Sequence, residues 1–437
     1  MGKGLVSGEN RTRVGLLLAI AGSWCWLWPT ASSGLQLFRH RKPNASSVTQ
    51  TKGPSASQPP AFSIPAEPLG FYAPGPFYLG QRESLVSLDF LDENRLLFTF
   101  RAPGLMHRTN GVETERQIRA VVLTLPKGTV EAEALWTLHD YGRYLWMLRD
   151  GHFLLRDQNT IKEGNAKLEL KPLLEFPGSL LSIEMDPGQQ YLVTNSLEPS
   201  PMKPQVGQVD SPKTAEADVS TDGLEDTKQR DIVLRILERA SGQVMLVSRV
   251  RVPVQLAINS AGYLETLSGA KNWVLSLDYF KGGSTVLGNI DSLCQPPAEF
   301  VSHDEVVINA CTQSGRRLIA MSTEGKKLWE ASSPSTQIWP ILVMGPGESR
   351  LARETLTLDH AIDDFGHALA PEDIKGQLVE VYDTAEGKLL LQAPSNPALD
   401  GGGNVAISPS GTRVAILNRG AIEVYILAEP ESTALKR

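Results

Sequence analysis

Clustered basic residues are absent from this sequence. Its 437 residues carry a formal net charge of −7, and no segment forms the positive stripe that a phosphate backbone requires. We therefore expect no nucleic-acid partner. The body of the chain also has no helical hydrophobic periodicity that lasts longer than two turns, which argues against α/β architectures.

The sequence frames of the common enzyme classes are missing as well. There is no Gly-x-Ser-x-Gly nucleophile turn, no His-Glu-x-x-His metal helix, no phosphate-binding Gly-x-x-x-x-Gly-Lys and no dinucleotide fingerprint. A catalytic site whose residues come from many loops has no short sequence motif of this kind. The absence therefore disfavours an enzyme without excluding one.

An export signal is predicted at the N-terminus, over residues 1–33. Three basic residues precede the apolar run at residues 14–28: Lys3, Arg11 and Arg13. Proline and small residues follow, as in segments that enter a translocon. We expect either cleavage after Ala31 or Ser33, or retention of residues 14–31 as a membrane anchor. The expected location is the periplasm, the cell envelope or the extracellular space.

Two segments have compositions typical of disorder. Residues 34–68 are rich in Ser, Pro and Thr, and they are predicted to be a linker between the export signal and a folded body at residues 69–430. Residues 197–230 are similarly polar and are predicted to be a disordered insertion within that body.

The folded body repeats two kinds of turn. The first kind precedes an apolar strand, as in "FLDENRLLFTF", "MDPGQQYLVTNS", "INSAGYLETLSG" and "ISPSGTRVAIL". The second joins two strands through Pro-x-Gly, Ser-Gly or Glu-Gly, as in "LTLPKGTVEAEAL", "RILERASGQVMLVSRV" and "VEVYDTAEGKLLLQA". The units recur roughly every 45–60 residues, which is close to the period of propeller blades.

This period, with about four strands per unit, predicts an all-β β-propeller with four-stranded antiparallel blades. Seven blades are favoured, with six or eight as alternatives. The units begin near residues 83, 143, 180, 254, 300, 338 and 400, and the second and sixth are the least regular. A strand at residues 77–79 is expected to pair into the last blade and close the ring.

The repeated segments resemble the blades of WD40, YVTN and quinoprotein-type propellers. The export signal, the linker and segments such as "VSLDFLDENRLLFTFRAPGL" are similar to uncharacterised exported propeller-like proteins of Acidobacteria. The resemblance covers residues 70–428 and implies the fold alone. In the tryptophan-docking repeats of quinoprotein propellers the tryptophan packs between blades, and "MSTEGKKLWEA" places Trp329 at that position. The Gly-His and Trp-Asp pairs of true WD40 blades do not repeat here.

Four further tryptophans lie in or beside predicted strands, where they are expected to fill the core or the space between blades. They are Trp136, Trp146, Trp273 and Trp339.

Two groups of residues have the chemistry of a site or a crosslink. Cys294 and Cys311 either form a disulfide, as an oxidising compartment allows, or are two separate buried thiols. A dense polar segment is a weak candidate for binding a divalent cation, with a hydrated acidic loop as the alternative. Its candidate ligands are Asp359, His360, Asp363, Asp364 and His367, with Asp373 nearby. No other cofactor is expected.

The leading hypothesis is a monomeric, non-enzymatic binding module for a protein, peptide or glycan, which binds at one rim or in the central channel. The alternatives are an envelope scaffold and a propeller enzyme, namely a hydrolase, a lyase or a quinoprotein-like oxidoreductase. Three or more carboxylates or imidazoles that converge on the channel mouth would favour the enzyme, and a broad apolar rim would favour a binder.

Overall fold

The computed structural model describes residues 57–73, 85–102, 115–139, 142–200, 230–269, 272–361, 371–399 and 401–430. All of these belong to one compact unit, Lys52–Arg437. The export signal and most of the linker lie outside the described residues. No helix among the described residues is long and apolar enough to cross a membrane.

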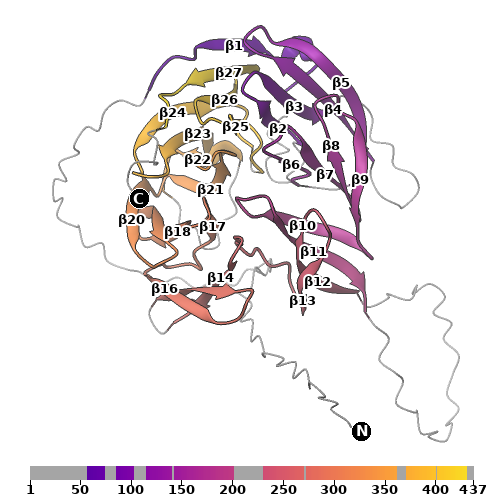
Figure 1. Ribbon diagram of the computed structural model, residues 1–437. Coiled ribbons are helices and arrows are strands. Elements are labelled where there is room, and N and C mark those ends of the chain that lie inside the picture. Colours follow the sequence, from indigo (N-terminus) through magenta and orange to yellow (C-terminus); the bar gives the residue numbers. More distant parts are fainter. Residues whose placement is uncertain are drawn as a thin grey trace, which may run out of the picture. The chain divides into compact units, whose positions relative to one another are not determined.

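Seven antiparallel sheets follow one another along the chain and surround a common axis (Figure 1). Blade 1 contains β2 (Ser87–Asp92), β3 (Arg95–Arg101), β4 (Arg116–Thr124) and β5 (Thr129–Leu138). Blade 2 contains β6 (Leu145–Met147), β7 (Phe153–Asp157), β8 (Thr160–Gly164) and β9 (Leu170–Glu175). Blade 3 contains β10 (Ser179–Met185), β11 (Tyr191–Pro199), β12 (Arg230–Glu238) and β13 (Val244–Val250).

The remaining blades continue in the same direction around the axis. Blade 4 contains β14 (Gly262–Ser268), β15 (Trp273–Tyr279) and β16 (Ser284–Ile290). Blade 5 contains β17 (Ala298–Phe300), β18 (Glu305–Thr312), β19 (Gly315–Ser322) and β20 (Lys327–Pro334). Blade 6 contains β21 (Gln337–Met344), β22 (Arg350–Leu358), β23 (Ile374–Asp383) and β24 (Leu389–Ser395). Blade 7 contains β25 (Val405–Ile407), β26 (Arg413–Asn418), β27 (Ala421–Ile426) and β1 (Phe62–Pro65). Two 3-10 turns, Glu67–Leu69 and Pro371–Asp373, are the helical elements of the described residues.

The predicted seven-bladed propeller is confirmed. The first strands of the seven units begin close to the predicted positions, and six of the seven sheets have four strands. Blade 4 is the exception, because its three strands are supplemented only by an isolated bridge between Ile258 and Tyr263.

The ring is closed by β1, which pairs antiparallel with β27 and so completes the last blade with the first described strand (Figure 1). The strand predicted to do this, at residues 77–79, lies outside the described residues. The linker predicted at residues 34–68 therefore includes β1, and its true end lies before residue 62. Of the four residues of β1, only Ile64 is buried. A short edge strand with one buried residue shows no clear alternation of apolar and polar residues, so its sequence resembles a linker.

Glycines at the hairpin turns adopt the conformation that the sequence predicts. Gly128, Gly242, Gly325 and Gly387 all have positive φ. At Gly387 a Cβ atom would also lie 2.5 Å from the Trp329 ring, so this turn packs directly on the indole. Only glycine satisfies both requirements there.

Apolar clusters fill the spaces between blades, because each blade has two apolar faces. Trp329 lies between blades 5 and 6, where its ring stacks on Tyr382 at 6.2 Å and its Nε1–H donates to the Thr384 carbonyl. Trp136 and Trp146 are also buried, as predicted, and Trp273 packs partly buried against a cluster. The prediction for Trp339 was wrong: it is 45% exposed, because the ladder of β21 is irregular between Ile338 and Ile341.

Substituting Ile64→Asp should destabilise the ring by roughly 3 kcal/mol, since it places an unpaired charge in the cluster between blades 7 and 1. Ser63→Asp is the matched control, because Ser63 is exposed on the same strand. Denaturant unfolding of both variants measures the difference. Equal stabilities would mean that β1 does not close the ring.

Candidate functional site

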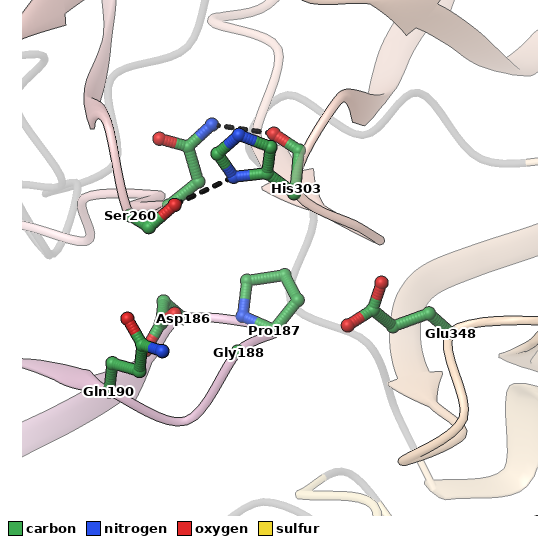
Figure 2. A pocket seen from close by; sticks show the side chains of 8 residues that line it. Asp186, Pro187, Gly188, Gln190, Ser260, His303 and Glu348 are labelled. Carbon is green, nitrogen blue, oxygen red and sulfur yellow. Dashed lines mark hydrogen bonds between the residues drawn. The ribbon is translucent and has the colours of Figure 1, made fainter.

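The turns that join the first and second strands of the blades, and in blade 4 the turn between Ile258 and β14, meet at one end of the channel. Four of them line a cavity of about 200 Å³. Its walls are Asp186, Pro187, Gly188 and Gln190 from blade 3, Asn259 and Ser260 from blade 4, His303 from blade 5 and Glu348 from blade 6 (Figure 2). We call this end of the ring the turn rim.

Side-chain oxygens hold these turns in shape. Asp186 Oδ1 accepts a hydrogen bond from Tyr191 N at 2.6 Å, and Asn259 Oδ1 accepts from Ala261 N and Gly262 N at 2.9 Å each. Asx and Ser turns of this kind are what the repeated Asp, Asn or Ser before each strand provides. The turn motif found in the sequence is therefore structural, and it also brings polar side chains to the turn rim.

Ser260 and His303 lie together on one wall of the cavity, opposite Pro187 (Figure 2). Ser260 Oγ lies 2.7 Å from His303 Nδ1, and Asn259 Nδ2 donates to the His303 carbonyl at 2.8 Å. These contacts join the turns of blades 4 and 5. The Ser–His pair has the heavy-atom separation of a nucleophile and its base.

An ion pair joins turns that are not neighbours in the ring. Arg149 comes from the turn between β6 and β7 in blade 2, and it pairs with Glu348 of blade 6. The same guanidinium donates to the Pro187 carbonyl of blade 3 at 2.9 Å. Arg149 therefore connects three blades at the turn rim.

Inside the channel, four charged residues from four blades interact. Asp89 lies on β2, Glu184 and Glu299 are the penultimate residues of β10 and β17, and Arg143 immediately precedes Tyr144 and β6. The charge of Arg143 acts on all three carboxylates, although it belongs to blade 2 and Glu299 to blade 5. First strands face one another across the axis, so this set, the channel cluster, lies within the channel.

The three carboxylates of the channel cluster all have raised pKa values. Burial raises the pKa of Asp89 and of Glu184. The hydrogen bond that Ser87 donates to Asp89, and then the charge of Arg143, partly offset the rise at Asp89, and the charge of Arg143 does so at Glu184. Burial, and then the nearby Glu184 charge, raise the pKa of Glu299 to about 7. Glu299 keeps solvent-accessible surface because it lines the channel, but the channel walls still remove its carboxylate from bulk water. A positive charge nearby would relieve the repulsion between Glu184 and Glu299.

Of the two alternatives for the cysteines, a disulfide or two separate thiols, the structure shows the disulfide. Cys294 and Cys311 form a disulfide with a Cα–Cα distance of 5.6 Å, which fastens the connection between blades 4 and 5 to β18. Neither cysteine lines the turn rim cavity.

The predicted acidic segment is described only in part. Asp363, Asp364 and His367 lie outside the described residues. Asp359 accepts hydrogen bonds from His360 at 2.6 Å and from Lys375 at 3.1 Å, and these lower its pKa. Among the described residues no three acidic, His or Cys side chains are placed to hold a metal ion.

The channel cluster was missed because its members occupy no motif in the sequence. A signal was nevertheless present: Glu184 stands two residues before Asp186, and Glu299 two residues before the turn that begins at Val301. Superposing the repeated units on their turns would have revealed an acidic residue at the same level in blades 3 and 5.

Comparison with known proteins adds likeness of fold only. No protein-family model matches the chain, and no curated protein matches it. Among solved structures, the WD40 domain of Toxoplasma gondii coronin is 10% identical with a TM-score of 0.45, over 85% of this chain and 86% of that domain. Acylaminoacyl peptidase of Pyrococcus horikoshii is 10% identical with a TM-score of 0.44, over 80% of this chain and 52% of that chain. This chain thus spans about half the length of that peptidase. The β-propeller fold rests on the chain's own seven sheets.

Substituting Glu299→Gln should stabilise the protein at about pH 8 and leave it unchanged below about pH 4.5. The folded-state pKa of Glu299 is raised from 4.5 to about 7, so wild-type stability is lost as the pH rises through that window. Thermal unfolding at a series of pH values measures the effect, with the exposed Glu324→Gln as control. A pH-independent difference would show that Glu299 does not titrate in this way.

Proposed function

We propose that this chain is a non-enzymatic binding module whose channel receives a basic segment of a peptide or partner protein. The observation that carries the proposal is the channel cluster, in which three carboxylates and one guanidinium come from four blades. A Lys or Arg side chain supplies the missing positive charge. A neutral glycan would leave the repulsion between Glu184 and Glu299 in place, so a peptide is preferred.

The turn rim supports entry from that end of the channel. It offers hydrogen-bonding groups at the mouth, including Ser260, His303 and Gln190. Glu184 lies two residues from Asp186, so the acidic level of the channel follows directly below the rim. Carboxylates within low-dielectric walls focus their field along the channel and steer a cation inward.

We also propose that the protein is exported. The disulfide between Cys294 and Cys311 supports this, because such bonds persist in oxidising compartments. Recovery of the chain from the cytoplasm, with both thiols reduced, would contradict export.

An enzyme is the second candidate function, most plainly a hydrolase. Two observations favour it: the pair of Ser260 and His303, and the three carboxylates of the channel cluster, whose convergence was expected of an enzyme. Among the described residues these carboxylates form no metal-binding group, and the hydrolase therefore depends on the Ser–His pair. A nucleophile also needs a base with a third group that orients it, and donors for the developing oxyanion. The contacts of this pair instead join two turns, which is a structural role. We therefore rank the hydrolase below the binding module.

A labelled peptide, acetyl-Lys-Val-Lys-Val-Lys-Val-Lys-Val-amide, should bind the full chain, and its Glu-for-Lys counterpart should not. Titration followed by fluorescence anisotropy measures both. The affinity should fall as the salt concentration rises, since the attraction is electrostatic. Substituting Glu184→Gln together with Glu299→Gln should weaken binding by about tenfold or more.

The matched control for that double variant is Glu324→Gln with Glu386→Gln, which removes two acidic residues from the hairpin turns of blades 5 and 6. Equal loss in both double variants would mean that overall charge, and not the channel cluster, holds the peptide. Binding of neutral oligosaccharides without binding of the Lys-Val peptide would replace the proposed ligand class.

If the chain were a hydrolase acting through Ser260, a fluorophosphonate probe would label the wild type and not the Ser260→Ala variant. We expect no labelling of either, because the hydroxyl bridges two turns. Mass spectrometry of the treated protein reads the result. Labelling confined to the wild type would reverse the ranking of the two functions.

A further inference from the structure

Blade 4 presents a free strand edge to the channel. Its sheet begins with β14, whereas the other blades place an additional strand between this position and the axis. Only the start of β14 is covered, by the bridge from Ile258 to Tyr263 and by the hydrogen bond from Leu264 N to the Ala257 carbonyl at 2.9 Å. The rest of the strand runs on to Ser268.

The segment that would cover β14 is held by blade 3. Val254 N donates to Asn195 Oδ1 at 3.1 Å, and Asn195 Nδ2 donates to the Val254 carbonyl at 2.9 Å. Asn195 belongs to β11, so these two bonds direct the segment toward blade 3. Pro253 precedes Val254 and has no backbone N–H, so it cannot donate a hydrogen bond to a neighbouring strand. The gap in blade 4 therefore follows from Asn195 and Pro253.

The exposed hydrogen-bonding groups of β14 can be assigned from strand geometry. Leu264 N points to the axis side, because it bonds Ala257. Successive residues alternate, so the N–H and C=O of Thr266 and the N–H of Ser268 point to the same side. Within the part of the chain that the structure describes, β14 has no ladder on this side beyond the bridge to Ile258.

The two blades that flank blade 4 carry acidic residues on their first strands. Glu184 and Glu299 belong to the blades on either side of blade 4, and the charge of one still reaches the other. The matching position of blade 4, two residues before Asn259, is the small residue Ala257. On β14 itself, burial and the neighbouring Asp278 raise the pKa of Glu265. The edge thus lies in a negative environment that is not filled by a large side chain.

We infer that β14 receives the basic segment as an added strand: an extended peptide pairs with Thr266 and Ser268 while its Lys or Arg side chains lie near Glu184 and Glu299. Main-chain hydrogen bonds supply affinity in strand addition, and side-chain positions supply specificity. Charge complementarity selects a basic occupant over a neutral or acidic one. This inference rests on the proposed peptide binding and assigns its location.

The test uses two N-methylated forms of the Lys-Val peptide with the full chain. One form carries methyl groups on the amides of all Lys residues, and the other on the amides of all Val residues. The two sets lie on opposite edges of an extended strand, and only one edge faces β14. We expect one form to lose about tenfold or more in affinity, as for two net hydrogen bonds, and the other to bind like the parent.

A protein variant tests the same contact from the other side. Thr266→Pro removes an N–H that points to the axis and leaves the ladder with β15 intact, so it should fold and bind the parent peptide about tenfold more weakly. Thr266→Val keeps the N–H and should bind normally. Circular dichroism establishes folding, and if Thr266→Pro does not fold the methylated peptides decide.

The outcomes separate this inference from the proposed function. If the parent peptide binds and the two methylated forms bind equally, strand addition is overturned and the proposed function stands. If the parent peptide binds and one form alone is weakened, the inference is supported. If the parent peptide does not bind, both fail.

Discussion

Mutual shielding of apolar faces is the constraint on which this structure depends. Each blade is apolar on both sides, so it needs a neighbour on both sides, and only a closed ring provides this for all seven. The cluster that joins blade 7 to blade 1 combines Ile64 and Phe71 from the N-terminal segment with Phe98 and Val424. Loss of the apolar contact between any two neighbouring blades would expose one apolar face of each.

Closure of the ring also brings together charged residues that are far apart in the sequence. Arg143 and Glu299 are more than a hundred residues apart in the sequence, yet their charges interact because first strands face a common axis. Arg149 and Glu348 meet at the turn rim for the same reason. The channel cluster and the rim cavity are therefore products of the ring and not of any single blade.

The difference between contacts within one blade and contacts across the ring explains which features could be predicted from the sequence. Local rules predicted the turns, because glycine at positive φ and an Asp, Asn or Ser before a strand act within a few residues. They also predicted Trp329, whose turn partner Gly387 lies on a repeated motif. The channel cluster could not be predicted from one unit, since the pKa of Glu299 is raised by burial and then by the charge of Glu184, which belongs to another blade. The strand β1 was missed because four residues with one buried side chain carry too little pattern.

The pairing of β1 with β27 also governs the order of events during biosynthesis. The strand that completes blade 7 emerges from the ribosome before any other described strand, and its partner emerges last. No partial chain can form a sealed ring, whatever its blades do individually. A chain of this design stays open between its first and last blades until its final strand is available.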